Sequence, residues 1–181
     1  MTTNENGGLF GNGSENGNGS LGPKTYAPTY SLYHPTGKNT GSAMSLERKA
    51  ATSEREGCIF ASVAPQKTVA GPDAKNATFA WEEKITVKLG ISDLSAMLLV
   101  LTGKKADLGA KGLYHDSGTA STGIQLRKVD TPVAGYAFEV AKKGKGEDGT
   151  VKRCHILLNE GEALALTLMF QHSIPVLAFG A

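Results

Sequence analysis

The sequence predicts an α+β fold built from two diverged β-β-β-β-α repeats, the first at residues 30–103 and the second at 112–181. Three stretches of the first repeat recur in the second in the same order: Leu-Tyr-His at 32–34 and 113–115, Gly-x-x-Phe at 57–60 and 135–138, and a β-rich run followed by an apolar run at 85–101 and 154–170. Self-similarity of this kind indicates two copies of one unit that bury their apolar faces together. The outer faces of the sheets would then stay free to bind something long.

A tail is expected at residues 1–23, ahead of a domain at 24–181. The tail is mostly Gly, Asn, Ser and Thr and has no Lys or Arg, so it cannot bury enough surface to offset the entropy of ordering and is predicted to be disordered. Without the tail's Glu5 and Glu15, the 19 basic residues face 15 acidic ones instead of 17. This mild excess of positive charge permits a polyanionic partner.

Four stretches of the first repeat have the pattern of β-strands: 30–34, 42–49, 58–64 and 79–89. Pro35 and Pro65 end the first and the third, and the turn-forming residues at 67–77 predict a hairpin loop. The fourth stretch alternates most clearly. Its period of two places Trp81, Ile85, Val87 and Leu89 on the inner face and Lys84, Thr86 and Lys88 on the outer face.

Each repeat is expected to close with a helix. In the first repeat Ser92 is the predicted N-cap, an apolar stripe follows, and Gly103 ends the helix. The second repeat has strands predicted at 123–129, 136–142 and 150–158, after which Asn159 and Glu162 have the spacing of a capping box. Pro175 is predicted to end this second helix.

The second helix is apolar on almost every side, although a helix that lies on one sheet needs only one apolar stripe. It could pack against the first helix alone, or it could form a subunit interface continued by the apolar residues at 174–179. We favour the interface, because so small a domain has little else to cover that surface.

Motifs for catalysis or metal binding are not recognised. Cys58 and Cys154 lie singly in strand-like runs without a CxxC motif, and we expect buried, reduced thiols. His115 is followed by Asp116, but no further cluster has ligand spacing, so His115 is interpreted as a structural histidine. Phosphate-loop, GxSxG and HExxH motifs do not occur. We therefore expect no enzyme, no cofactor, no metal and no small-molecule substrate.

No targeting peptide is recognised, which favours a cytoplasmic protein of bacterial or phage origin without membrane contact.

Several segments together carry a family resemblance: Phe-Ala-Trp-Glu-Glu-Lys at 79–84, the apolar run to 101, Leu-Tyr-His-Asp at 113–116, and the closing segment 159–180 with its internal Pro175. In order and spacing, residues 30–180 resemble the Whirly family of single-stranded DNA-binding proteins. The resemblance implies a PC4-like fold of two packed antiparallel four-stranded sheets with the helices at one end, a homotetramer with these helices at its core, and a nucleic-acid strand bound along the sheets. Kinetoplastid mitochondrial RNA-binding proteins share this fold, which leaves RNA as an alternative.

One departure from the family concerns the second strand. Where the family has Lys-Gly-Lys-Ala-Ala, this chain has Asn-Thr-Gly-Ser-Ala at 39–43, and the nearby basic residues are Lys38, Arg48 and Lys49.

Sequence-tolerant binding of single strands requires cations that follow the backbone and aromatic faces on which bases stack. Lys84 and Arg153 occupy the same outward position in the two repeats, and the Lys-rich hairpin at 142–145 forms a compact basic tip. For Trp81 the alternation predicts core packing, whereas the resemblance favours the edge of a cleft. Phe60 and Tyr136 could equally pack in the core or stack on bases. The candidate nucleic-acid-binding residues are Tyr33, Lys38, Lys49, Phe60, Trp81, Lys84, Lys88, Arg127, Lys128, Tyr136, Lys142, Lys143, Lys145 and Arg153.

The sequence thus predicts a protein that binds single-stranded DNA with little sequence specificity and protects or organises it in replication, recombination or repair. An RNA-binding protein of the same fold is one alternative. A structural or partner-binding oligomer that uses the fold without nucleic acid is the other.

Overall fold

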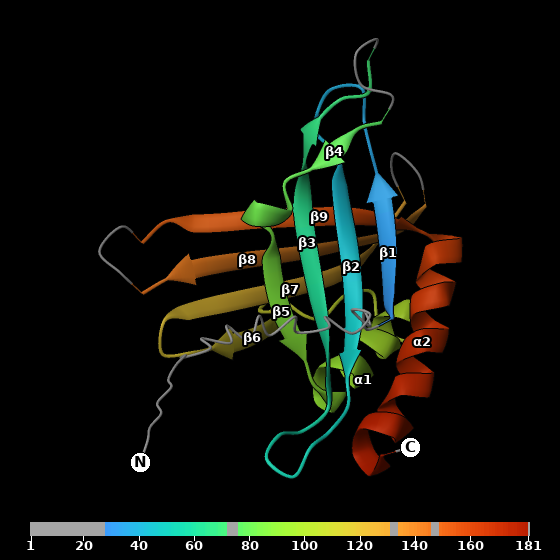
Figure 1. Cartoon of the computed structure of the whole chain (residues 1–181). Coiled ribbons are helices and arrows are strands. Elements are labelled where there is room, and N and C mark those ends of the chain that lie inside the picture. The colour runs from blue at the N-terminus through green and yellow to red at the C-terminus, as the bar shows by residue number, and fades with distance from the viewer. Residues whose placement is uncertain (1–27, 72–75, 131–133, 146–148, 181) are drawn as a thin grey trace, which may run out of the picture.

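Each repeat folds into an antiparallel sheet of four main strands followed by a helix, as the sequence predicts (Figure 1). The computed structural model describes residues 28–71, 76–130, 134–145 and 149–180, so the predicted tail at 1–23 lies outside the described residues. The first sheet has the order β1 (Thr29–His34), β2 (Ser42–Lys49), β3 (Cys58–Thr68), β5 (Ile85–Leu89), and the two-residue β4 (Thr78–Phe79) pairs with the far end of β3. The second sheet has the order β6 (Leu113–Asp116), β7 (Ala120–Val129), β8 (Gly135–Gly144), β9 (Val151–Asn159). The helices are α1 (Ile91–Leu101) and α2 (Glu160–Phe179).

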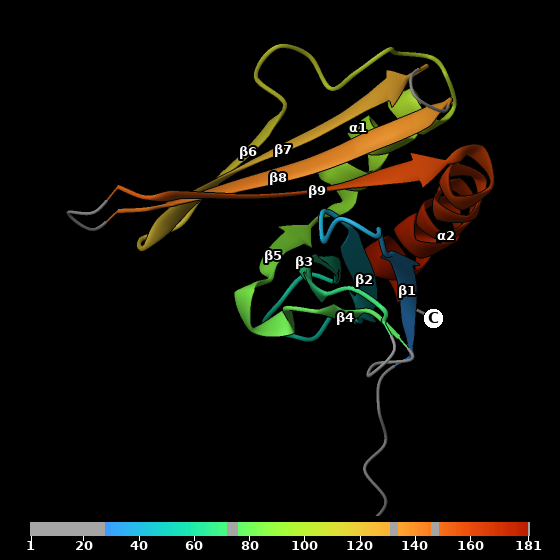
Figure 2. The ribbon, with the colours of Figure 1, turned by 90° about the horizontal axis from the view of Figure 1, so that it is seen from above.

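The two sheets cross, and the strands of one run in a different direction from those of the other (Figure 1). Both helices lie together at one end of the crossed sheets (Figure 2). The paired end of β8 and start of β9 (141–144 and 151–153), which we call the β8–β9 arm, project from the opposite end. This arrangement agrees with the predicted packing of two sheets with the helices at one end.

A single core joins the two repeats, because both sheets and both helices contribute to it. Alternate residues of each strand point inward, as expected for sheets with one buried face. The largest fully buried side chains are Val63, Ile85, Leu89, Leu94, Val100, Ile124, Leu126, Phe138, Ile156, Leu158, Leu166 and Phe170. Among the residues that the structure describes, neither repeat has a core of its own, so the duplicated units are expected to fold as one.

The prediction of one continuous strand at 79–89 is wrong, because the strand is interrupted. After β4 the chain forms a short 3₁₀ helix, η1 (Trp81–Glu83), before it continues as β5. The Ala80 amide donates to the Pro65 carbonyl at 2.9 Å, and the Glu83 amide donates to the Ala80 carbonyl at 2.9 Å. These bonds turn the chain, so Trp81 does not follow the period of two that holds from Ile85 to Leu89.

The helix ends confirm two of the predicted signals and correct two others. Asn159 and Glu162 form the predicted capping box of α2, with both bonds at 2.9 Å. Gly103 has φ +72° just after the last residues of α1, as a helix end favours. The N-cap of α1 is Gly90 and not Ser92, because the Asp93 carboxylate accepts the Gly90 amide at 2.9 Å.

Pro175 does not end α2, which continues to Phe179. A proline inside a helix removes one N–H donor and leaves the carbonyl four residues earlier without its bond. Pro175 and Gln171 are both exposed, so water can satisfy that carbonyl.

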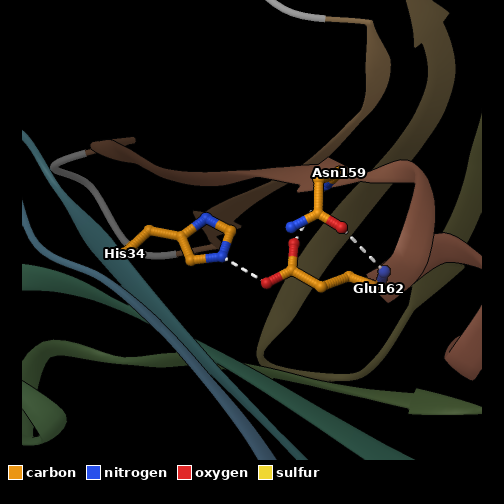
Figure 3. Close-up of polar contacts among 3 residues, drawn as sticks. All are labelled: His34, Asn159 and Glu162. Atoms are coloured by element: carbon orange, nitrogen blue, oxygen red, sulfur yellow. Dashed lines mark hydrogen bonds and ion pairs between the residues drawn. The ribbon is translucent and has the colours of Figure 1, made fainter.

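Two histidines tie the repeats together crosswise. His34 of β1 lies with Nε2 2.7 Å from Oε1 of Glu162, whose other carboxylate oxygen caps α2 (Figure 3). His115 of β6 lies with Nε2 3.1 Å from Oδ1 of Asp93, the capping carboxylate of α1. Each repeat therefore supplies the histidine that contacts the capping carboxylate of the other repeat. His115 is a structural residue, as interpreted from the sequence.

One side of α2 is buried against the sheets and α1, and the other presents apolar side chains. Ala163, Leu166, Phe170 and Leu177 are buried, whereas Leu164 is 60% exposed, Leu168 58% and Phe179 90%. By length and composition alone α2 could cross a membrane, but a helix that closes a core has the same composition. The apolar character on both sides agrees with the sequence prediction for this helix.

Candidate nucleic-acid interface

A groove of about 790 Å³ crosses the outer face of the first sheet. We call it the aromatic groove. Its lining comes from alternate residues of β1, β2, β3 and β5 together with η1: Thr29, Ser31, Tyr33, Ser45, Glu47, Phe60, Ser62, Trp81, Lys84 and Thr86. The neighbours of these residues along each strand point into the core, so the same alternation that builds the core also builds the groove.

The middle of the groove is a row of four hydroxyl side chains. The strand register places Ser31 beside Ser45, Ser45 beside Ser62, and Ser62 beside Thr86. Ser31 Oγ lies 3.3 Å from Ser45 Oγ, and Ser62 Oγ lies 2.8 Å from Thr86 Oγ1. Because these side chains are short, the floor of the groove lies below the larger side chains around it.

Aromatic rings stand at the edges of this floor. The ring of Tyr33 is 54% exposed and lies 5.5 Å from the ring of Phe79 and 6.4 Å from that of Trp81, nearly perpendicular to the latter. Trp81 and Phe60 are half-buried. Rings held by neighbouring rings, with part of each face open, can stack on flat apolar ligands.

The structure therefore resolves the two interpretations of Trp81. The tryptophan lies at the edge of a groove and not in the core, because η1 turns it out of the alternation of the strand.

Several exposed lysines lie in or near the aromatic groove. Lys84 lines it, and Lys88 lies beside Phe60 in the strand register. Lys49 forms an ion pair with Glu47 on the same face, which reduces its free charge. Lys38 lies in the exposed turn between β1 and β2.

The outer face of the second sheet has a related but less aromatic hollow of about 500 Å³. Arg153 and Leu157 of β9 line it, as does Arg127, whose Nη2 lies 2.9 Å from Oε1 of Glu139. Across this sheet the register places Tyr114, Gly123, Ala141 and Arg153 in one row. The first sheet has Tyr33, Ala43 and Ala64 in the corresponding row, and Lys84 lies just before Ile85, the partner of Val63. The correspondence of Lys84 with Arg153 that the repeats predicted thus agrees with the register.

Three of the candidate residues lie on the core-facing side of the second sheet and not on its outer face. Tyr136 donates its hydroxyl to the Leu101 carbonyl at 3.2 Å, so it packs toward α1. Lys128 shares this side, since the register places it beside Tyr136. Lys142 also shares it, two residues after the buried Val140. Alternation sets these directions, and counting from the buried Phe138 would have given them.

The other lysines of the β8–β9 arm differ in their surroundings. Lys143 lies on the outer face near the end of the arm, and Lys145 pairs with Asp116, with Nζ 2.7 Å from Oδ1. Lys152, which was not among the predicted residues, lies directly opposite Lys142 in the register. The hydroxyl row was not predicted either, although its small polar residues all fall on the outward-facing positions of the four strands.

Of the two cysteines, Cys58 is buried and Cys154 is half-buried. Burial raises the pKa of the Cys58 thiol, although the positive charges of Lys88 and Lys49 oppose the shift. Burial also raises the pKa of the Cys154 thiol. Both cysteines are free; the predicted burial holds for Cys58 but is wrong for Cys154. Within the described ranges, no group of three or more His, Cys, Asp or Glu side chains could hold a metal ion.

Two crossed antiparallel four-stranded sheets with helices at one end define a Whirly-like fold, and the comparison with solved structures agrees. The crystal structure of WHY3 from Arabidopsis thaliana superimposes with a TM-score of 0.64 at 17% identity, over 88% of this chain and 92% of that one. The plant transcriptional regulator PBF-2 gives 0.65 at 16% identity, over 85% and 84%. A guide-RNA-binding protein complex bound to a guide RNA gives 0.57 at 12% identity, over 85% and 94%. No protein-family model and no curated sequence matches the chain. At these identities the likeness establishes the fold.

Proposed function

We propose that this protein binds single-stranded nucleic acid, DNA in the first instance, with little sequence preference. The strand would lie along the outer faces of the sheets, with bases against Tyr33, Phe60 and Trp81. Its phosphates would contact Lys84 and Lys88 on the first sheet and Arg153 on the second. Stacking and backbone charge contacts together are the usual basis of sequence-tolerant binding.

The aromatic groove is the observation that carries this proposal. It combines an open, polar floor with rings at its edges and a lysine in its lining. A surface that served only as a rigid support would not require exposed aromatic rings beside cations. The similarity to a protein complex bound to a guide RNA supports nucleic acid as the ligand class.

The single tryptophan of the chain supplies a direct test, because Trp81 lies in the groove. Titration with an oligothymidine of about 20 nucleotides should quench its fluorescence. The logarithm of the affinity should fall linearly with the logarithm of the salt concentration, by about 0.7 for each phosphate neutralised on a single strand. Absence of both quenching and binding at low salt would contradict the proposal.

RNA is the second candidate, because a guide-RNA-binding complex has the same fold. The groove floor carries hydroxyl groups that can hydrogen-bond to a ribose 2′-hydroxyl as well as to bases. Matched DNA and RNA oligonucleotides in the same titration separate the two. A duplex should bind more weakly than either, because its paired bases cannot stack on the rings.

The biological role that fits this binding is the protection or organisation of single strands in replication, recombination or repair. A homotetramer formed through the helices is part of the proposal, and the exposed apolar side chains of α2 support it. A structural oligomer without nucleic acid is the competing function. It would give an assembly of the same size without any response to oligonucleotides.

A further inference from the structure

A second hollow, which we call the lysine hollow, lies where the β8–β9 arm passes the first sheet. It measures about 330 Å³ and is lined by Lys84, Ile85, Lys142, Gly144, Gly149, Thr150 and Lys152. Its three charged lining residues are all lysines, and they come from both repeats. Glycines form part of its wall, so backbone is open to a ligand there.

The lysines of this hollow have an unfavourable arrangement in the free protein. Lys142 and Lys152 are direct cross-strand partners on one face of β8 and β9. Like charges placed directly opposite each other destabilise a strand pair. The ion pairs found among the described residues engage other lysines, namely Lys49, Lys67 and Lys145. Glu83 does not line the hollow, but it is a nearby negative charge, since its charge and that of Lys152 both act on the pKa of the Cys154 thiol.

The lysine hollow is continuous with the aromatic groove through one residue. Lys84 lines both, since it lies between η1 and β5 at the edge of the first sheet. A nucleic-acid strand whose bases stack in the aromatic groove would therefore meet a row of positively charged side chains at this edge of the first sheet. That charge leads from Lys84 to Lys142 and Lys152, and the β8–β9 arm continues into the second sheet.

We propose that the lysine hollow is a phosphate-binding site for the backbone of the nucleic-acid strand, at the point where the strand passes from the first sheet to the second. This inference rests on the proposed function and adds the route by which the nucleic-acid strand passes between the two sheets. The polyanion relieves the repulsion between Lys142 and Lys152, which the free protein tolerates at the expense of stability.

The test uses the full chain with Lys142→Gln and Lys152→Gln combined, and a control with Lys104→Gln and Lys105→Gln. The control removes the same charge from the exposed loop after α1. With an oligothymidine of about 20 nucleotides, the K142Q/K152Q variant should bind about tenfold more weakly than the control, and its salt slope should be smaller by about 1.4. Quenching of Trp81 at saturation should be unchanged, because the groove stays intact. The melting temperature should stay equal or rise, because the opposed charges are gone.

Two further measurements distinguish the possible outcomes. The charge-preserving variant with Lys142→Arg and Lys152→Arg should bind like the wild type. A tetrathymidine, short enough to occupy the groove alone, should bind K142Q/K152Q and the wild type equally. If the wild type binds the long oligonucleotide while K142Q/K152Q and the control lose the same affinity and salt slope, the lysine hollow is not a phosphate site and the proposed function stands. If the wild type neither binds nor shows quenching, the proposed function itself fails.

Discussion

At the scale of single residues, the direction of a side chain decides whether it can meet a ligand. Tyr33 and Tyr136 have similar chemistry and both were candidates. Tyr33 is 54% exposed at the groove, whereas Tyr136 donates its hydroxyl to the Leu101 carbonyl inside the fold. The alternation of side chains along each strand is enough to predict this difference. It does not predict the position of Trp81, because η1 depends on a backbone hydrogen bond from Ala80 to Pro65, which a local sequence pattern does not show.

The first prediction concerns the rings of the groove. Tyr33→Ala and Trp81→Ala should each weaken oligothymidine binding by roughly 5- to 150-fold, because stacking contributes about 1–3 kcal/mol per base. Fluorescence anisotropy of a labelled oligonucleotide measures this without relying on the tryptophan. Tyr136→Phe is the matched control, since it removes a hydroxyl on the core-facing side, and its affinity should equal that of the wild type. Equal losses in the control and the groove variants would place the effect in folding and not in stacking.

At the scale of elements, the order of strands and helices was predictable, and their junctions were less so. Alternation and apolar stripes follow from which face is buried, and they held in nearly every strand. The N-cap of α1 depends on the Asp93 carboxylate, which accepts the Gly90 amide, so the helix begins before the predicted Ser92. Helix α2 continues through Pro175, where the exposed Gln171 carbonyl, which loses its helical hydrogen bond, can bond to water.

The crosswise contacts of the histidines could not be predicted, because each joins a strand of one repeat to the capping carboxylate of the other repeat's helix. His34 and Glu162 are 128 residues apart, and His115 and Asp93 are 22 apart. Only the crossing of the two sheets brings each histidine to the helix of the other repeat. The recurrence of Leu-Tyr-His in the sequence indicated the duplication but not this exchange.

The second prediction concerns this exchange. Glu162→Ala should lower the free energy of unfolding by about 1–2 kcal/mol, since it removes one half of a capping box together with the contact to His34. Combined with His34→Ala in a double-mutant cycle, the coupling between the two side chains should be at most about 1 kcal/mol, because the pair is partly exposed. Urea denaturation gives both values. A coupling of zero would mean that Glu162 acts through the cap alone.

The third prediction concerns the cations that recur in the two sheets. Lys84→Ala combined with Arg153→Ala should weaken binding to all sequences alike and reduce the salt slope by about 1.4, with the melting temperature preserved. Both side chains lie on exposed faces, so their removal leaves the core unchanged. Lys104→Ala with Lys105→Ala serves as the charge-matched control. A loss confined to one sequence would contradict backbone binding and indicate base readout.

At the scale of the whole molecule, duplication explains both what is buried and what is left exposed. Two sheets that share one core have two outer faces, and each face carries a tyrosine at one edge of a row and a cation at the other. The faces differ in detail, since the first has the hydroxyl floor and the tryptophan, while the second has Leu157 and the ion pair of Arg127 with Glu139. The first sheet is therefore expected to contribute most of the stacking, and the second mainly charge.

The helices pose the remaining question of the whole molecule, namely what covers the outer side of α2. Leu164, Leu168, Pro175 and Phe179 are exposed, and their spacing along the helix places them in one stripe. Met169 is also apolar, but it packs partly buried against the core. A charge at Met169 would disturb the fold, whereas a charge at Leu168 changes only the exposed side of α2.

The last prediction is that Leu168→Glu separates the subunits without unfolding them. The wild type should scatter light as a tetramer at micromolar concentration, and the variant as a smaller species, because a charge buried unpaired in an apolar interface is strongly unfavourable. Circular dichroism should show the same secondary structure in both. Leu157→Glu is the control, since Leu157 is 45% exposed on the second sheet, away from α2, and its variant should keep the size of the wild type. A wild type that scatters as a monomer would show that the stripe on α2 is not a subunit interface.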